Sequence, residues 1–284
     1  MNALAQRPKS GCLKRLIQLF LLVCLAIYLV LLAFVAISQR KMIYPAPIFT
    51  PQQVDEMARD SNLQRWTNSS GEFIGVKRLS PIQPATGQVL ILHGNGSYAA
   101  GCAHYADEIQ RVAGMDVFIL EYPGYADRPG TPSEKNLFQA ADEAFGLLAT
   151  NEPVYLLGES LGTGVAAYLA GTHSNGISGL ILVSPYNRLA DVAQYHMPIF
   201  PVHLLLLDRF RSQVLLRNYH GPLGVVVDGQ DMVVPEKFGL RLYNGYAGPK
   251  QLWEFEYGGH TSIAEPPAKF WREVFGFWQT NRVR

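Results

Sequence analysis

One serine of this chain stands in a setting that favours nucleophilic chemistry. Ser160 lies between two glycines in GESLG, residues 158–162, directly after an apolar run that predicts a strand. A G-x-S-x-G pattern between a strand and a helix is typical of a nucleophile elbow, in which the serine has a strained backbone conformation. Gly158 and Gly162 are expected because a side chain at either would collide with the neighbouring strand or helix. The same residues also fit an ordinary Gly-rich turn, so the chemistry depends on partners elsewhere in the chain.

A serine nucleophile needs an acid and a histidine base, which follow it in that order in this architecture. His260 is the predicted base, because it ends the stretch YGGH after the last predicted strand, where loops form the active edge of an α/β sheet. The other histidines lie in predicted turns, helices or connectors, and we interpret them as solvated, core or loop-supporting residues: His93, His104, His173, His196, His203 and His220.

Two aspartates in LGVVVDGQDMVVP compete for the role of the acid. We predict Asp231, because the turn at Asp228-Gly229 carries it beyond the sheet edge toward His260. Asp228 is expected to brace that turn with its side chain. A carboxylate beside His260 would hold the imidazole in the productive tautomer and stabilise its charged form.

A second glycine-rich turn, HGNG at residues 93–96, follows the predicted strand QVLILHG. Hydrolases of this architecture place one oxyanion donor there and another just after the nucleophile. We therefore predict the backbone N–H groups of Asn95 and Leu161 as donors, with Gly96 as the alternate, and we expect His93 to support the loop. A phosphate-binding turn is the other interpretation, but the chain lacks a G-x-G-x-x-G pattern and a Walker lysine.

Short β-branched runs alternate with segments of helical length, which predicts a mostly parallel central sheet flanked by helices. Several strands are apolar throughout, as expected for strands that are covered on both faces. The predicted strands are 71–80, 88–94, 116–122, 153–159, 179–185, 223–229 and 250–257, and the predicted helices are 100–113, 133–149, 161–170, 236–246 and 265–280.

In combination, these motifs resemble the serine hydrolases of the α/β-hydrolase fold, and within them the membrane-anchored group that includes α/β-hydrolase domain-containing protein 13. The resemblance runs from about Arg40 to the C terminus, and it implies this fold with a short cap, Ser160 as nucleophile, Asp231 as acid and His260 as base. The motifs that carry it are RKMIYP, LHGNG, EYPGY, GTPSE, GESLGTG, SPY, DGQDMVVP and GGH.

The chain departs from that family pattern at two places. Asp228-Gly229 stands where the family often has His-Gly, and Glu121-Tyr122-Pro123 stands where Asp-Tyr-Arg is frequent. Neither departure touches the predicted triad, so both bear on substrate or stability.

Residues 16–37 are almost uninterrupted apolar residues. A helix of that length rises about 33 Å, enough to cross a bilayer core of ~30 Å. We predict an uncleaved signal anchor; a cleaved signal peptide is the alternative, since its apolar region is usually shorter but Ala36-Ile37-Ser38 resembles a cleavage site. The excess of basic residues before the span over those after it predicts a cytoplasmic N terminus and an extracytoplasmic catalytic domain, periplasmic if the protein is bacterial.

The sequence therefore predicts four parts: a cytoplasmic segment (1–15), the transmembrane anchor (16–37), a connector into the domain (38–70) and the catalytic domain (71–284). Of the three cysteines, Cys12 and Cys24 precede that domain and Cys102 is alone in it, so no internal disulfide is expected there.

A formal net charge of +1 without a basic stripe argues against nucleic acid as a partner. No metal or other cofactor is expected, because HExxH, paired Cys-x-x-Cys and acidic calcium loops are missing from the sequence.

The expected function is hydrolysis of an ester or thioester, with an acylated or lipid-like substrate that concentrates near the membrane. A serine peptidase with the same triad is one alternative, and a catalytically silent binding module on the same scaffold is another. The apolar stretch PIFPVHLLLLDRF, residues 198–210, is predicted either to pack in the cap or to line an acyl pocket. The oligomeric state is left open.

Overall fold

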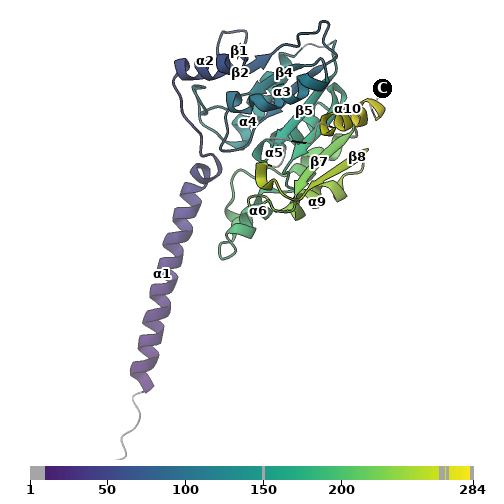
Figure 1. Ribbon diagram of the computed structural model, residues 1–284. Coiled ribbons are helices and arrows are strands. Elements are labelled where there is room, and N and C mark those ends of the chain that lie inside the picture. The colour runs from purple at the N-terminus through teal and green to yellow at the C-terminus, as the bar shows by residue number, and fades with distance from the viewer. Residues whose placement is uncertain (1–9, 149–150, 262–265, 267–268, 282–284) are drawn as a thin grey trace, which may run out of the picture. The chain divides into compact units, whose positions relative to one another are not determined.

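The computed structural model describes residues 10–148, 151–261, 266 and 269–281 (Figure 1). The chain divides into two compact units, residues 1–42 and 43–284. The first is a helix, α1 (Ser10–Ile43), of which Leu13–Ile43 is long and apolar enough to cross a membrane. Its predicted role as an anchor over residues 16–37, like the other domain limits, stays a prediction.

The second unit is built on an eight-stranded sheet with the order β1-β2-β4-β3-β5-β6-β7-β8. Strands β3 to β8 run parallel to one another, and β1 and β2 add an antiparallel edge beside β4. This sheet confirms the predicted fold class. The strands are β1 (Gln64–Thr67), β2 (Phe73–Arg78), β3 (Gln88–Leu92), β4 (Asp116–Leu120), β5 (Val154–Glu159), β6 (Ile177–Val183), β7 (Leu223–Asp228) and β8 (Lys250–Phe255).

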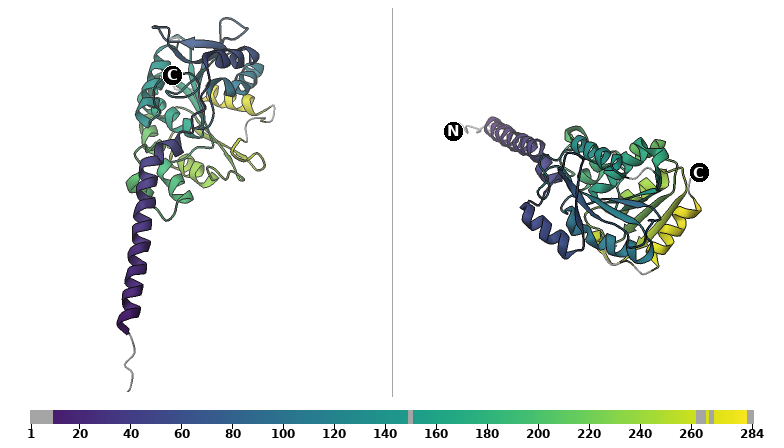
Figure 2. Two further views of the ribbon diagram at one scale, coloured as in Figure 1. Left: turned by 90° about the vertical axis from the view of Figure 1, so that its left-hand side faces the viewer. Right: turned by 90° about the horizontal axis from the view of Figure 1, so that it is seen from above.

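Helices cover both faces of the sheet, as the views in Figure 2 show. Alternate residues of one strand enter different cores: Leu90 and Leu92 of β3 join the core under α4 (Glu134–Gly146), α5 (Leu161–Thr172) and α9 (Glu236–Gly245). Val89 and Ile91 join the core under α2 (Pro51–Asp60), α3 (Ala103–Val112) and α10 (Phe270–Thr280). This two-sided burial explains why the central strands are almost continuous apolar runs.

A short cap, as expected, connects β6 to β7. It contains α6 (Leu189–His196), α7 (Val202–Leu205) and α8 (Ser212–Leu215). A small apolar cluster of Ala190, Val202 and Leu206 holds it together, separate from the two main cores. Short 3₁₀ turns complete the fold: η1 (Ala99–Cys102), η2 (Ser174–Gly176), η3 (Leu216–Asn218) and η4 (Gly259–Thr261).

Two elements lie in the stretch that we treated as a connector. Helix α2 begins with a capping box between Thr50 and Gln53 and has Pro51 in its first turn, a start signal that the sequence analysis missed. Strand β1 is only four residues long and has one buried side chain, Trp66, so no alternating pattern marks it.

Candidate active site

The serine of the G-x-S-x-G motif sits on a sharp turn between β5 and α5. Ser160 has φ 49° and ψ −115°, a backbone conformation that non-glycine residues rarely adopt, and its N–H donates to the carbonyl of Val183 on β6 at 2.9 Å. The neighbouring glycines are required sterically. A Cβ at Gly162 would lie 1.9 Å from the carbonyl oxygen of Leu92, and one at Gly158 would lie 2.7 Å from the carbonyl oxygen of Gly162. The expected collisions with strand and helix are confirmed.

The structure brings the three predicted catalytic side chains into one hydrogen-bonded chain. His260, on η4 after β8, has its Nε2 2.9 Å from the Oγ of Ser160 and its Nδ1 2.8 Å from Oδ2 of Asp231. Because a carboxylate oxygen only accepts, Nδ1 carries the hydrogen and Nε2 accepts from the Ser160 hydroxyl. This is the tautomer that general-base catalysis by His260 requires.

Asp231 is buried and stays ionised through its hydrogen bonds. Burial by itself raises the pKa of this carboxyl, but the hydrogen bond from His260 and that from the Val234 N–H outweigh burial, so the net pKa lies below the ordinary value of 3.8. The N–H groups of Val233 and Val234 donate to Oδ1 at 2.9 and 2.8 Å, which leaves Oδ2 for His260.

Asp228 has a different set of partners. Its Oδ1 accepts the Gln230 N–H at 2.8 Å, as expected for a residue that braces the turn. Its Oδ2 accepts the Gly258 N–H at 2.9 Å and so also fixes the loop that carries His260. Asp231, and not Asp228, therefore reaches the histidine in this structure, while the catalytic role of Asp231 stays a prediction.

The loop at residues 93–97, which we call the oxyanion loop, passes directly beside the nucleophile. A Cβ at Gly94 would lie 3.5 Å from the Cβ of Ser160, and a Cβ at Gly96 would face open space. Leu161 is the first residue of α5, so its N–H is one of the helix-terminal donors that have no intrahelical partner. Among the described residues, the N–H groups of Asn95 and Leu161 have no hydrogen-bond acceptor. Both predicted oxyanion donors are therefore free to bind a developing negative charge.

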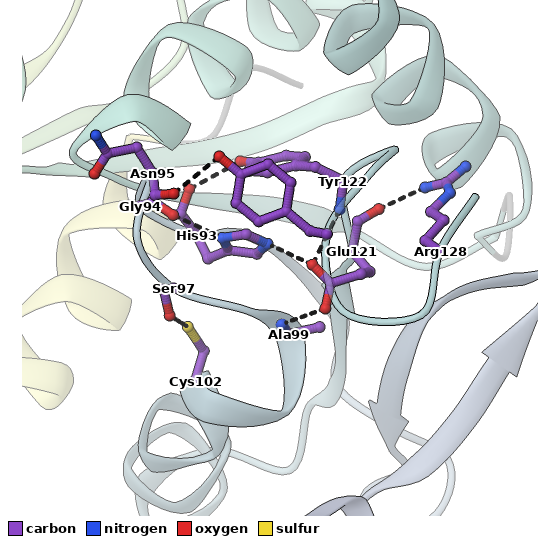
Figure 3. A network of polar contacts seen from close by, with 10 residues as sticks. His93, Gly94, Asn95, Ser97, Ala99, Cys102, Glu121, Tyr122 and Arg128 are labelled. Atoms are coloured by element: carbon purple, nitrogen blue, oxygen red, sulfur yellow. Dashed lines mark hydrogen bonds and ion pairs between the residues drawn. The ribbon is translucent and has the colours of Figure 1, made fainter. Parts of the chain in front are cut away.

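A buried polar network holds the oxyanion loop (Figure 3). The Nδ1–H of His93 donates to the Gly94 carbonyl at 2.8 Å, and its Nε2 lies 3.0 Å from Oε1 of Glu121. The other oxygen of Glu121 accepts the Ala99 N–H at 2.9 Å, beyond the far end of the loop. Both His93 and Glu121 are almost completely buried. The network therefore clamps the loop at its two ends.

Two tyrosines of the EYPGY motif complete this support. The Tyr122 hydroxyl donates to the His93 carbonyl at 3.0 Å, and the Tyr125 hydroxyl donates to the Asn95 carbonyl at 2.8 Å. The Asn95 side chain donates to the Ile43 carbonyl at 3.2 Å. The predicted supporting role of His93 thus depends on the EYPGY motif, to which the sequence alone assigned no contact with this loop.

Ser184 was also missed, although it lies in the SPY motif at the end of β6. Like Ser160 it has φ 49°, and its N–H donates to the Val226 carbonyl at 2.9 Å, so β6 ends in a second turn of the same kind. Its hydroxyl is buried close to Asp231 and helps to lower the pKa of that carboxyl. Serine before proline is a common turn sequence, so this contact had no signal of its own.

The apolar stretch 198–210 is divided between core and surface. Leu206 is only 6% exposed and belongs to the cap cluster, whereas Leu204 is 82% exposed and Leu207 is 63% exposed. Leu206 therefore packs in the cap, and the predicted contribution of this stretch to an acyl pocket stays a prediction.

The fold and the arrangement of these side chains are those of a serine hydrolase. A family model described as serine aminopeptidase, S33, matches residues 83–222. An uncharacterized protein of Mycobacterium tuberculosis (strain CDC 1551 / Oshkosh) is 30% identical over 238 residues, which cover 81% of this chain and 83% of that protein. The chain therefore belongs to the α/β-hydrolase family of serine hydrolases. The narrower membrane-anchored group suggested by the sequence motifs stays a prediction.

Two further similarities concern proteins of described activity. Lysophosphatidylserine lipase ABHD12 of Rattus norvegicus is 30% identical over 190 residues, 59% of this chain and 47% of that protein, so the chain spans about half the length of this relative. The crystal structure of Paleococcus ferrophilus monoacylglycerol lipase is 20% identical, with a TM-score of 0.55 over 76% of this chain and 98% of that one. This second similarity concerns the fold alone.

Proposed function

We propose that this protein is a membrane-anchored serine hydrolase that cleaves an ester or thioester of an acylated or lipid-like substrate. The observation that carries the proposal is the continuous chain of hydrogen bonds from Ser160 through His260 to Asp231 at a strained elbow. The lipase named among the relatives supports an acyl ester as the substrate class. The apolar helix α1 supports a site held near the lipid phase.

In the proposed mechanism, Ser160 is the nucleophile and His260 is the base. Oγ forms a bond to the acyl carbonyl carbon while its proton moves to Nε2 of His260, and Asp231 stabilises the resulting imidazolium. The carbonyl oxygen becomes an oxyanion bound by the N–H groups of Asn95 and Leu161. The C–O or C–S bond then breaks, and the alcohol or thiol leaves with the proton from His260. Water, activated by the same histidine, attacks the acyl-enzyme and releases the acid.

Amide cleavage is the second candidate, and the description of the family model favours it. A peptidase would use the same nucleophile, base and oxyanion donors, so the distinction lies in the substrate. A panel of p-nitrophenyl esters and aminoacyl p-nitroanilides separates the two, and we expect faster turnover of the esters. A silent binding module, the remaining alternative, would not need Ser160, Asp231 and His260 in hydrogen-bond contact.

The decisive variant is Ser160→Ala in the full-length chain. It should abolish ester hydrolysis and labelling by a fluorophosphonate, because both require Oγ, and it should leave the melting temperature nearly unchanged. Asn218→Ala, a substitution at an exposed turn, serves as the control and should keep both activities. Labelling of the Ser160→Ala protein at the wild-type rate would contradict the proposed nucleophile.

A further inference from the structure

Three arginines of the cap converge on one pocket at the protein surface. Arg188 precedes α6, and Arg209 and Arg211 flank Phe210 in the chain between α7 and α8. With His203 they line a pocket of about 230 Å³, whose apolar lining includes Leu206 and Val214. We call this the arginine pocket. No carboxylate lies among its lining residues, so its charge is positive.

Nearby acids do not form ion pairs with these guanidinium groups. In the described part of the chain, none of the three arginines forms an ion pair with a carboxylate. Glu134 is close to Arg211, but its two oxygens accept the backbone N–H groups of Arg209 and Phe210, at 2.7 and 2.8 Å. Asp208 is buried and close to the hydroxyl of Tyr44. Asp191 is 3.7 Å from His203 only.

The cap also carries exposed apolar side chains close in sequence to the residues that line the pocket. Leu204 and Leu207 on the cap are strongly exposed, as reported above, and Ile199 is 68% exposed. Ile43, the last residue of the apolar span Leu13–Ile43, packs against the cap cluster of Ala190, Val202 and Leu206. The residue at which the apolar span ends is therefore itself in contact with the cap.

We propose that the arginine pocket binds the phosphate group of an anionic phospholipid at the membrane surface. Guanidinium groups bind phosphate with two parallel hydrogen bonds, which matches three arginines around one concave site. Exposed leucines beside a basic pocket are the pattern of a surface that enters the headgroup region and reaches the acyl chains. The proposal concerns lipid binding and does not depend on hydrolysis.

The test uses the full-length Ser160→Ala protein, so that turnover of lipid does not affect the result. The protein is placed in nanodiscs of phosphatidylcholine alone or of phosphatidylcholine mixed with phosphatidylglycerol, and hydrogen exchange is measured over residues 199–214. We expect exchange in this segment to be at least tenfold slower in the anionic nanodiscs. The triple variant Arg188→Gln, Arg209→Gln, Arg211→Gln should lose that protection while keeping its melting temperature.

A matched control removes three other exposed arginines, at Arg59, Arg217 and Arg272, and should keep the protection. Equal exchange in the two lipid mixtures would overturn the proposal, and so would loss of protection in the matched control, since the effect would then be one of net charge. Equal protection by inorganic phosphate in phosphatidylcholine nanodiscs would also overturn it, because the pocket would then be a site for soluble anions. Failure of the hydrolase proposal would show instead in the ester assay of the wild-type protein.

Discussion

At the scale of single residues, the two aspartates after β7 provide the sharpest test of the proposed site. Asp231→Asn should lower kcat by about four orders of magnitude, because an amide at this position favours the wrong tautomer of His260. Asp228→Asn should lower the melting temperature through the weakened Gly258 and Gln230 contacts, with a much smaller loss of kcat. Steady-state kinetics and thermal unfolding of both variants decide the assignment. The reverse pattern would mean that Asp228 is the acid.

The lowered pKa of Asp231 also predicts how stability depends on pH. A carboxyl whose pKa is lower in the folded state than in the unfolded state contributes its full stabilisation at pH values above its ordinary pKa of 3.8. This stabilisation is lost as the pH falls toward the pKa of the folded state. Asp231→Asn lacks this contribution. The difference in free energy of unfolding between wild type and variant should therefore shrink as the pH is lowered from neutrality through 3.8. Urea unfolding in detergent measures it, and a difference independent of pH would contradict the argument.

The sequence predicted these catalytic candidates because each carries a local signal. Ser160 lies in a fixed pattern between a strand and a helix, and Asp231 and His260 follow predicted strand ends. The contacts of Glu121 and Ser184 could not be predicted in this way, because they depend on how β4 and β6 pair with their neighbours. A buried carboxylate next to a histidine from another strand is visible only after the strands are paired in register.

At the scale of elements, the elbow depends on the close approach of α5 to β3. Gly162→Ala should prevent folding or lower stability by several kcal/mol, because its Cβ would meet the Leu92 carbonyl oxygen at 1.9 Å and backbone cannot move aside cheaply. Gly96→Ala is the matched substitution, since its Cβ would face open space and its backbone N–H is kept. The two variants are compared by their expression levels and melting temperatures. A Gly162→Ala protein as stable as Gly96→Ala would show that the elbow can relax.

The oxyanion loop offers a second prediction at this scale. Glu121→Gln keeps the shape of the side chain but removes the negative charge that faces His93 and Ala99 N–H. The clamped loop should loosen, and kcat should fall by up to about 10²–10³, the effect of losing one oxyanion donor, with KM changed little. Glu108→Gln, a surface substitution in a pair with Arg111, is the control and should have no effect on kcat. An effect on melting temperature alone would assign the network to stability.

The elements that the sequence missed have few buried side chains, and most of them are short. Predicted strands such as 88–94 and 153–159 coincide with β3 and β5, because strands buried on both faces are continuous apolar runs. In the cap, α7 and α8 have four residues each, too short for a helical period to show in the sequence. Their positions depend on packing around Leu206, which the pattern of the chain does not reveal.

At the scale of the whole molecule, the first residues of the second unit contact both the site and the cap. The Ile43 carbonyl accepts the side chain of Asn95, whose N–H is a predicted oxyanion donor, and Ile43 also packs on the cap. Burial raises the pKa of the Tyr44 hydroxyl, and the nearby Asp208 raises it further, so Tyr44 stays neutral against the cap. Ile43 and Tyr44, which begin the second unit, are thus part of the wall of the catalytic domain.

The orientation of the chain in the membrane is the last prediction. Basic residues near a span stay on the cytoplasmic side, so the N terminus should be cytoplasmic and the domain should lie outside. The basic residues before and after the apolar run are Arg7, Lys9, Lys14 and Arg15, then Arg40 and Lys41.

A cysteine introduced by Lys269→Cys, at an exposed position of the domain, should react with a membrane-impermeant maleimide in intact cells or spheroplasts, whereas Cys12 should react only after permeabilisation. Cys102 gives little background, because its thiol is buried and desolvation raises its pKa. Labelling of Cys12 before permeabilisation would reverse the topology. Recovery of a soluble product that starts near Gln39 would instead show a cleaved signal peptide.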